Sequence, residues 1–123
     1  MRAFYTILCL SCIMLGAITV NHFYISGLSA NLITHLEQLE LPTEENNTAH
    51  KAIQLRRQWE DNRPFVQITV NHTEIEMISN AVDELCVFAE HQNIAEFERA
   101  RKLLVNALEE LGLSEELSIT NIL

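Results

Sequence analysis

The stretch that decides the fold is AFYTILCLSCIMLGAITV, Ala3 to Val20, which has 18 residues and no charged side chain. The apolar character continues weakly to Ile25. A helix from Ala3 to Ile25 would span roughly 34 Å at a rise of about 1.5 Å per residue. Because the hydrocarbon core of a bilayer is about 30 Å thick, the sequence predicts a helix that crosses a membrane once.

The charges around this stretch predict its orientation. Arg2 and the α-amino group are the only fixed charges at its start, and the first acidic residue after it is Glu37. Positive charge tends to stay on the cytoplasmic side. We therefore expect a single-pass protein of the cell membrane with its N-terminus in the cytoplasm, its C-terminal domain outside, and Phe23 and Tyr24 at the outer interface.

We expect residues 1–27 to form the membrane anchor and residues 28–123 to form an extracytoplasmic helical domain. The alternative is a cleaved signal peptide. Its best cut would follow Ala30, but Leu28 fits poorly at the third position before the cut, where a small residue is usual. Both interpretations export the rest of the chain, and whether the anchor is cleaved stays open.

The composition favours helices and argues against nucleic-acid binding. The 123 residues, enough for one domain, include 8 Lys and Arg against 17 Asp and Glu. Such an acidic excess argues against a basic nucleic-acid interface. With only 3 Gly and 2 Pro, turns must be few and elements long, which disfavours a β-sandwich.

Apolar residues recur at helical spacing after the anchor. A leucine stripe extends the first helix to about Glu40, ahead of Pro42: Leu28, Leu32, Leu36 and Leu39. A second helix is expected from Ala49 to Pro64, where proline should kink the chain or begin a new helix. A last helix is expected from Asn93, which forms a capping-box pattern with Glu96, to a glycine C-cap at Gly112.

Residues 65–70, FVQITV, fit either an edge strand or a helix. Their alternation of β-branched and polar residues is typical of a strand, but a lone strand would have no partner. A helical stripe also runs unbroken through Ile68, His72, Ile75, Ile78, Val82, Leu85 and Ala89. We therefore expect a long helix from Pro64 to Glu90, and an apolar tail after Gly112 that folds back. The fold class is all-α: an N-terminal transmembrane helix continuing into an antiparallel bundle of about three helices.

Several features carry a family resemblance. They are the anchor with its leucine extension (residues 28–41), Trp59, Asn71-His72 with Glu74 and Ile75, the segment 97–111, and the closing LSITNIL of residues 117–123. Together they resemble the family domain of unknown function 4363, small proteins of Gram-positive spore formers with a membrane anchor and a helical body. The resemblance implies location and architecture but no reaction, and it implies an uncharacterised multi-span membrane protein as a partner.

The chemistry-bearing residues offer one weak metal candidate. His72 and Glu76 stand four residues apart, which places two ligands on one helical face. A metal-binding protein or metal-dependent hydrolase would need further ligands from another helix. No Gly-x-Ser-x-Gly motif or glycine-rich phosphate loop occurs, so we expect no catalytic residue, no resident metal and no cofactor. A third hypothesis is a binder of cationic ligands through the acidic face.

The hypothesis that the sequence favours is an interaction or accessory subunit of a membrane complex. Candidate partner contacts are the large apolar residues Trp59 and Phe97 and the C-terminal Ile122 and Leu123. As core residues Trp59 and Phe97 would be ordinary, whereas as exposed residues they would dominate an interface. The sequence leaves open the partner, the oligomeric state and pairing of Leu28 to Leu39 with a second copy.

Overall fold

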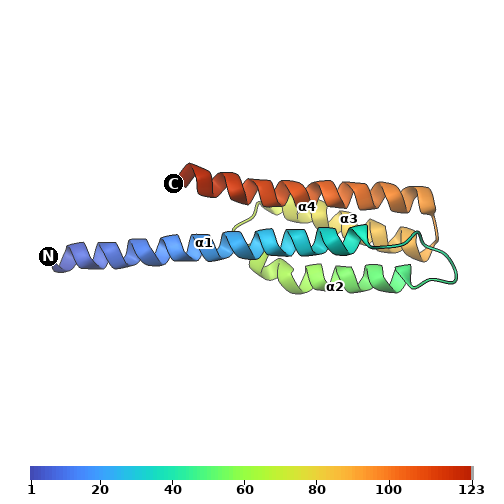
Figure 1. The fold of residues 1–123 in the computed structure, drawn as a ribbon, viewed down its shortest axis with the longest axis horizontal. Helices are drawn as coiled ribbons and strands as arrows, with labels where there is room; N and C mark the ends of the chain where they lie inside the picture. The colour runs from blue at the N-terminus through green and yellow to red at the C-terminus, as the bar shows by residue number, and fades with distance from the viewer. Residues whose placement is uncertain (123) are drawn as a thin grey trace.

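The computed structural model describes the backbone of residues 1–122 and the side chains of residues 1–112. Four helices and no strand are found within that range. They are α1 (Arg2–Glu37), α2 (Thr48–Val66), α3 (His72–Glu90) and α4 (Ile94–Ile122). Consecutive helices run in opposite directions (Figure 1). The expected antiparallel helical bundle is therefore present, with four helices rather than about three.

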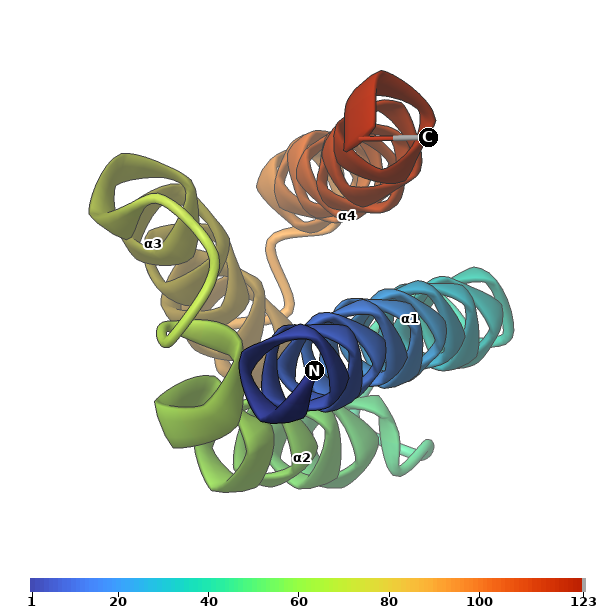
Figure 2. The same cartoon turned by 90° about the vertical axis from the view of Figure 1, so that its left-hand side faces the viewer.

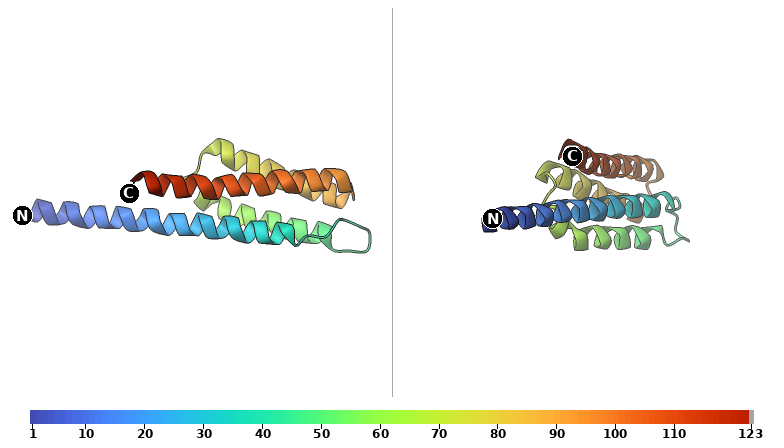
Figure 3. Two further views of the ribbon diagram at one scale, coloured as in Figure 1. Left: turned by 45° about the horizontal axis from the view of Figure 1, so that its top comes forward. Right: turned by 60° about the vertical axis from the view of Figure 1, so that its left-hand side comes forward.

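The helices form a ring around one core. α1 packs closely on α4, α4 on α3, and α3 on α2, while α1 and α2 touch only lightly. Figure 2 shows this ring from the end at which the chain starts. The N-terminal half of α1 projects beyond the other helices, as both views of Figure 3 show. Only the C-terminal half of α1 belongs to the bundle.

The expected apolar stripes form the core. All four leucines of the first stripe are buried, and so is the α3 stripe from Ile75 to Ala89. The fully buried large side chains include Trp59 of α2 and Phe97 of α4, both at 0% exposure. The leucine stripe, which could have paired with a second copy, packs instead against the protein's own helices.

The expected long helix from Pro64 to Glu90 is wrong. α2 continues through Pro64 and ends at Val66, and α3 starts only at His72. Asn71 makes the break, because its side-chain Oδ1 accepts a hydrogen bond from the Thr73 backbone N–H at 2.9 Å. An N-cap of this kind satisfies one of the free donors of a new helix.

The break also removes two residues from the expected buried stripe. Ile68 lies in the turn between α2 and α3 and is 76% exposed. The side chain of His72, in the first turn of α3, is 75% exposed. The strand alternative for this segment is equally wrong, because Phe65 and Val66 are helical and the following residues form a turn.

The expected helix end at Gly112 is wrong as well, because α4 continues to Ile122. A glycine inside a helix costs roughly 0.5–1 kcal/mol relative to alanine, which weakens a helix without ending it. The tail therefore extends α4 and does not fold back. The side chain of Ile122 and the whole of Leu123 lie outside the described residues.

Asn71 offers a direct test of the α2–α3 break. Asn71→Ala should lower the free energy of unfolding by about 1 kcal/mol, the usual cost of losing an N-cap. Asn71→Asp keeps the acceptor oxygen and should cost much less. Urea unfolding of the full-length chain in non-ionic detergent micelles, followed by far-ultraviolet circular dichroism, measures both. Equal losses in the two variants would contradict the cap.

Candidate functional site

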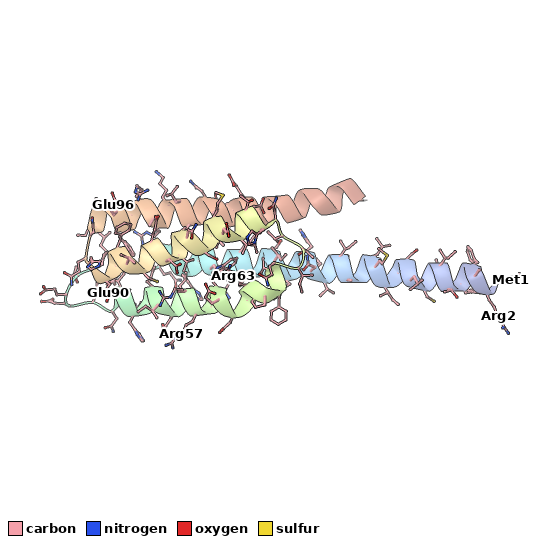
Figure 4. All side chains as sticks on the ribbon, turned by 180° about the vertical axis from the view of Figure 1, so that it is seen from behind. Met1, Arg2, Arg57, Arg63, Glu90 and Glu96 are labelled. Atoms are coloured by element: carbon pink, nitrogen blue, oxygen red, sulfur yellow. The ribbon has the colours of Figure 1, made fainter. Side chains whose placement is uncertain are left out.

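The two halves of α1 differ sharply in their surroundings. Every residue from Met1 to Ala17 is exposed, whereas Ile25 is completely buried in the bundle. In Figure 4 the labels Met1 and Arg2 mark the tip of the projecting half, and the labelled charges Arg57, Arg63, Glu90 and Glu96 all lie on the bundle. By length and composition α1 could cross a membrane, and it is the one described helix that could.

Polar contacts fasten the α2–α3 turn to α1 at the place where the apolar stretch ends. Asn21 Nδ2 donates to Thr69 Oγ1 at 3.0 Å. One turn later, the Tyr24 hydroxyl donates to Asn62 Oδ1, whose amide in turn donates to the Gln58 carbonyl at 2.7 Å. The turn is therefore held at the level of Asn21. We call this part of the molecule the junction, Asn21 to Tyr24 with Asn62 to Thr69.

An apolar groove adjoins the junction. It is lined on α1 by Gly16, Ala17 and Val20 and on α2 by Phe65, and the polar residues Asn21, Tyr24 and Asn62 line it on the side of the bundle. Phe65 is 61% exposed, so the bundle leaves much of its ring uncovered. A groove with apolar walls and a polar end suits an apolar chain or ring.

His72 and Glu76, the metal candidates, are brought together but on the surface. His72 Nε2 lies 2.9 Å from Glu76 Oε1, with the two side chains 75% and 58% exposed. Among the described residues no group of three His, Cys, Asp or Glu side chains could hold a metal ion. The pair can therefore act as an exposed ion pair or supply two ligands.

Three buried polar side chains of the described bundle, Ser29, Thr48 and Ser79, have structural hydrogen bonds. Ser29 Oγ donates to the Leu108 carbonyl, and Thr48 Oγ1 donates to the Glu40 carbonyl at 3.0 Å. Ser79 Oγ accepts from Trp59 Nε1 at 2.9 Å. Ser29 and Ser79 therefore hold helices together, and Thr48 holds the start of α2 to the loop that follows α1.

Cys86 is the buried cysteine of the bundle. Its Sγ donates to the Ala52 carbonyl at 3.3 Å, which joins α3 to α2. Burial raises the pKa of the Cys86 thiol by desolvating its charged form, which outweighs the opposing effect of Arg56. Because the thiolate is the nucleophile, this environment keeps Cys86 unreactive.

Arg101 of α4 joins the opposite end of the bundle. Its guanidinium donates to the carbonyls of Leu36, at 3.4 Å, and Leu39, where α1 ends. It also pairs with Glu98 and lies 5.3 Å from the centre of the Phe97 ring. Partial burial lowers the pKa of the Arg101 guanidinium by desolvating its charged form. The residue caps the end of α1.

The partner-contact candidates fall in different places. Trp59 and Phe97 are core residues of the folded chain, at 0% exposure. The side chains of Ile122 and Leu123 lie outside the described residues. Sequence reasoning missed the exposure of Phe65 and Ile68. One feature of the sequence could have indicated this exposure. The segment between Arg63 and Glu74 has no Lys, Arg, Asp or Glu, so it is a short uncharged stretch like the longer one in α1.

Comparison with known proteins gives a family match. A family model described as a domain of unknown function (DUF4363) matches residues 19–122. The matched region therefore includes the junction as well as the whole bundle. No curated protein and no solved structure matches the chain significantly.

Proposed function

Because the chain belongs to the DUF4363 family, whose description assigns no activity, we propose a function from the structure itself. The protein is a membrane-anchored subunit that crosses the cell membrane once with α1. It presents its bundle outside the cytoplasm as an interaction or accessory component of a membrane complex. Its partner is a multi-span membrane protein, in keeping with the family resemblance.

The observation that carries this proposal is the contrast within α1. The projecting half exposes large apolar side chains along its length: Phe4, Tyr5, Ile7, Leu8, Leu10, Ile13, Met14, Leu15 and Val20. Burial of one such side chain is worth about 1.5–3 kcal/mol. Leaving all nine in water would forgo roughly 14–27 kcal/mol, more than the whole stability of a small domain, roughly 5–15 kcal/mol. A bilayer removes that cost.

The packing of α1 supports retention of the anchor over cleavage. A cut after Ala30 would remove Ile25, Leu28 and Ser29, which are all buried in the bundle. It would leave only the last two turns of α1 to pack against α4. The bundle is therefore built around a helix that a signal peptidase would destroy, and this favours a retained anchor.

The buried polar groups support the accessory role. Ser29, Thr48 and Ser79 are used to hold the bundle together, and burial keeps the thiol of Cys86 protonated. These four groups therefore serve the structure of the bundle, whereas the buried Nδ1 of His22 has no hydrogen-bond partner among the described residues. A rigid bundle fixed to the membrane at one end is suited to contacts with a neighbouring membrane protein.

The anchor and its orientation can be tested together. The full-length chain should stay in the membrane pellet at alkaline pH, and protease added to intact cells should remove the bundle. Leu8→Arg/Ile13→Arg, which puts two charges into the apolar half, should release the chain, because each central Arg costs about 2.5–3.5 kcal/mol. A bundle that resists protease in intact cells but not in lysed cells would show that the orientation is wrong. A mature chain that begins at residue 31 would show that the anchor is cleaved.

The accessory role is tested by crosslinking in intact membranes followed by mass spectrometry. We expect one multi-span protein to be recovered repeatedly with the full chain. A chain lacking residues 117–123 is the comparison, since it tests the contribution of the C-terminal candidates Ile122 and Leu123. Recovery of no reproducible partner would argue against the accessory role while leaving the anchor intact.

The contact between His72 and Glu76 keeps metal binding as a second candidate function. Zn²⁺ or Mn²⁺ bound at one ion per chain after tag-free purification, and lost in His72→Ala, would favour it. A further ligand would then have to come from a partner or another copy, because the described residues place only two ligands together.

The third candidate function is a binder of cationic ligands. It predicts an affinity for cationic peptides that falls steeply as the salt concentration rises.

A further inference from the structure

The α2–α3 turn, at the end of the bundle nearest the N-terminus (Figure 1), exposes large apolar side chains and carries no Lys, Arg, Asp or Glu. Phe65 and Ile68 are 61% and 76% exposed there, and Phe23, two residues after Asn21 on α1, is 69% exposed. The segment between Arg63 and Glu74, which contains this turn, is uncharged throughout. Large exposed apolar side chains grouped at one end of a bundle indicate a surface that is covered.

The opposite end of the bundle is different. The loop between α1 and α2 carries Glu40, Glu44 and Glu45, and α3 ends at Glu90. Figure 4 places Glu90 and Glu96 at this end, far from the projecting half of α1. The two ends of the bundle are therefore suited to different surroundings, and the charged end is suited to water.

The hydrogen bond between Asn21 and Thr69 fixes the level of the apolar end. The uncharged stretch Ala3 to Val20 ends directly before Asn21. As a helix these 18 residues are roughly 27 Å long, close to the hydrocarbon thickness of about 30 Å. With that stretch in the bilayer, the α2–α3 turn lies at the boundary between hydrocarbon and headgroups.

The groove at the junction gives a second, independent indication. Phe65 forms one wall and Gly16, Ala17 and Val20 the other. These three residues of α1 belong to the stretch assigned to the bilayer, so Phe65 reaches below the level of Asn21. No side chain of the described residues fills the space between them. Its apolar walls suit an acyl chain, and its polar end lies at the expected headgroup level.

We propose that this end of the bundle is a second membrane contact. Phe65 and Ile68 insert into the outer interface of the membrane that α1 crosses, and a lipid acyl chain occupies the groove beside Gly16. The inference rests on the proposed anchor. Its occupant is bilayer lipid, because the patch is continuous with the lipid-facing surface of α1 and lies at the bilayer boundary. The bundle is therefore held at a fixed height and tilt by two contacts.

Brominated lipids test this contact, because they quench nearby tryptophan. The full-length chain is reconstituted into phosphatidylcholine vesicles with brominated acyl chains, carrying either Ile68→Trp or Ile94→Trp. Ile94 is the matched control, since it is an exposed isoleucine at the α3–α4 turn, at the other end of the bundle. The fluorescence of the native Trp59, measured in the chain without these substitutions, is subtracted from the fluorescence of each variant.

In brominated vesicles, compared with unbrominated ones, we expect the tryptophan of Ile68→Trp to lose most of its emission intensity. Its emission maximum should also lie at shorter wavelength than that of Ile94→Trp. The emission intensity of Ile94→Trp should be the same in both kinds of vesicle. Phe65→Asp, added to Ile68→Trp, should restore much of the emission, whereas Phe65→Leu should not. Phe65 is exposed, so these changes leave the core intact.

Flotation of the vesicles separates the membrane contact from the anchor as proposals. A chain that floats with vesicles but shows equal emission at both positions overturns the membrane contact alone, and a chain that does not float overturns the anchor with it.

Discussion

Trp59→Ala is expected to lower the free energy of unfolding of the bundle by about 3–5 kcal/mol, the usual cost of truncating a buried tryptophan. Trp59 is fully buried, and its Nε1 donates to Ser79 Oγ at 2.9 Å, which ties α2 to α3. A small domain has roughly 5–15 kcal/mol of stability in total. The variant should therefore lie close to unfolding at physiological temperature.

Trp59→Phe, Ser79→Ala and the variant with both changes separate the packing of the Trp59 ring from its hydrogen bond. Trp59→Phe keeps most of the ring but leaves Ser79 buried without its donor, at a cost of about 1–3 kcal/mol for the unsatisfied group. Adding Ser79→Ala should recover part of that loss, because no polar atom is then left unpaired. Urea unfolding in non-ionic detergent micelles, followed by circular dichroism, measures the cycle. Additive losses in the double variant would contradict a coupled pair.

Most of the fold follows from local patterns in the sequence. The leucine stripe of α1, the α3 stripe after Ile75 and the capping pattern of Asn93 with Glu96 all occur where they were expected. These signals are local, because helical periodicity and caps depend on residues a few positions apart. They define which face of each helix is buried before any partner is known.

The errors occur where local signals compete. Pro64 was expected to begin a helix, but it lies within the last turn of α2, and Asn71 starts α3 instead. Apolar periodicity continued across this break by coincidence, so Ile68 and His72 were placed on a buried stripe. Gly112 satisfies the pattern of a C-cap, yet it lies inside α4. Periodicity gives no information on whether a backbone break interrupts it.

The candidate site could be predicted only in part. The apolar stretch of α1 is visible in the sequence, because membrane insertion depends on a continuous run of residues. The junction is not visible, because it depends on the contact of Asn21 with Thr69, which are 48 positions apart. The same holds for the exposure of Phe65, which follows from where α2 ends relative to α1. Long-range contacts of this kind leave no periodic pattern in the chain.

Phe97→Ala is expected to cost about 3–5 kcal/mol of unfolding free energy, because it affects both the core and the cap of α1. The ring is fully buried, and it supports the Arg101 guanidinium, which lies 5.3 Å from the ring centre. Arg101 donates to the carbonyls of Leu36 and Leu39, which lie at and just beyond the end of α1. Loss of the ring should therefore loosen the seam between α4 and α1 as well as the core beneath it.

Two further variants divide these contributions. Phe97→Leu keeps most of the apolar volume and should cost clearly less than Phe97→Ala. Arg101→Met keeps an unbranched stem but removes the guanidinium donor of the Leu39 carbonyl, while the Leu36 carbonyl still accepts from the Leu39 N–H, so it should cost about 1–3 kcal/mol. Arg101→Met combined with Phe97→Ala should cost less than the sum of the single losses, because the ring already supports the guanidinium.

Hydrogen exchange at the end of α1 measures the cap directly. Backbone amides near Leu39 should exchange faster in Arg101→Met and in Phe97→Ala than in Phe97→Leu. Equal exchange in all three variants would show that Arg101 does not hold α1 to α4.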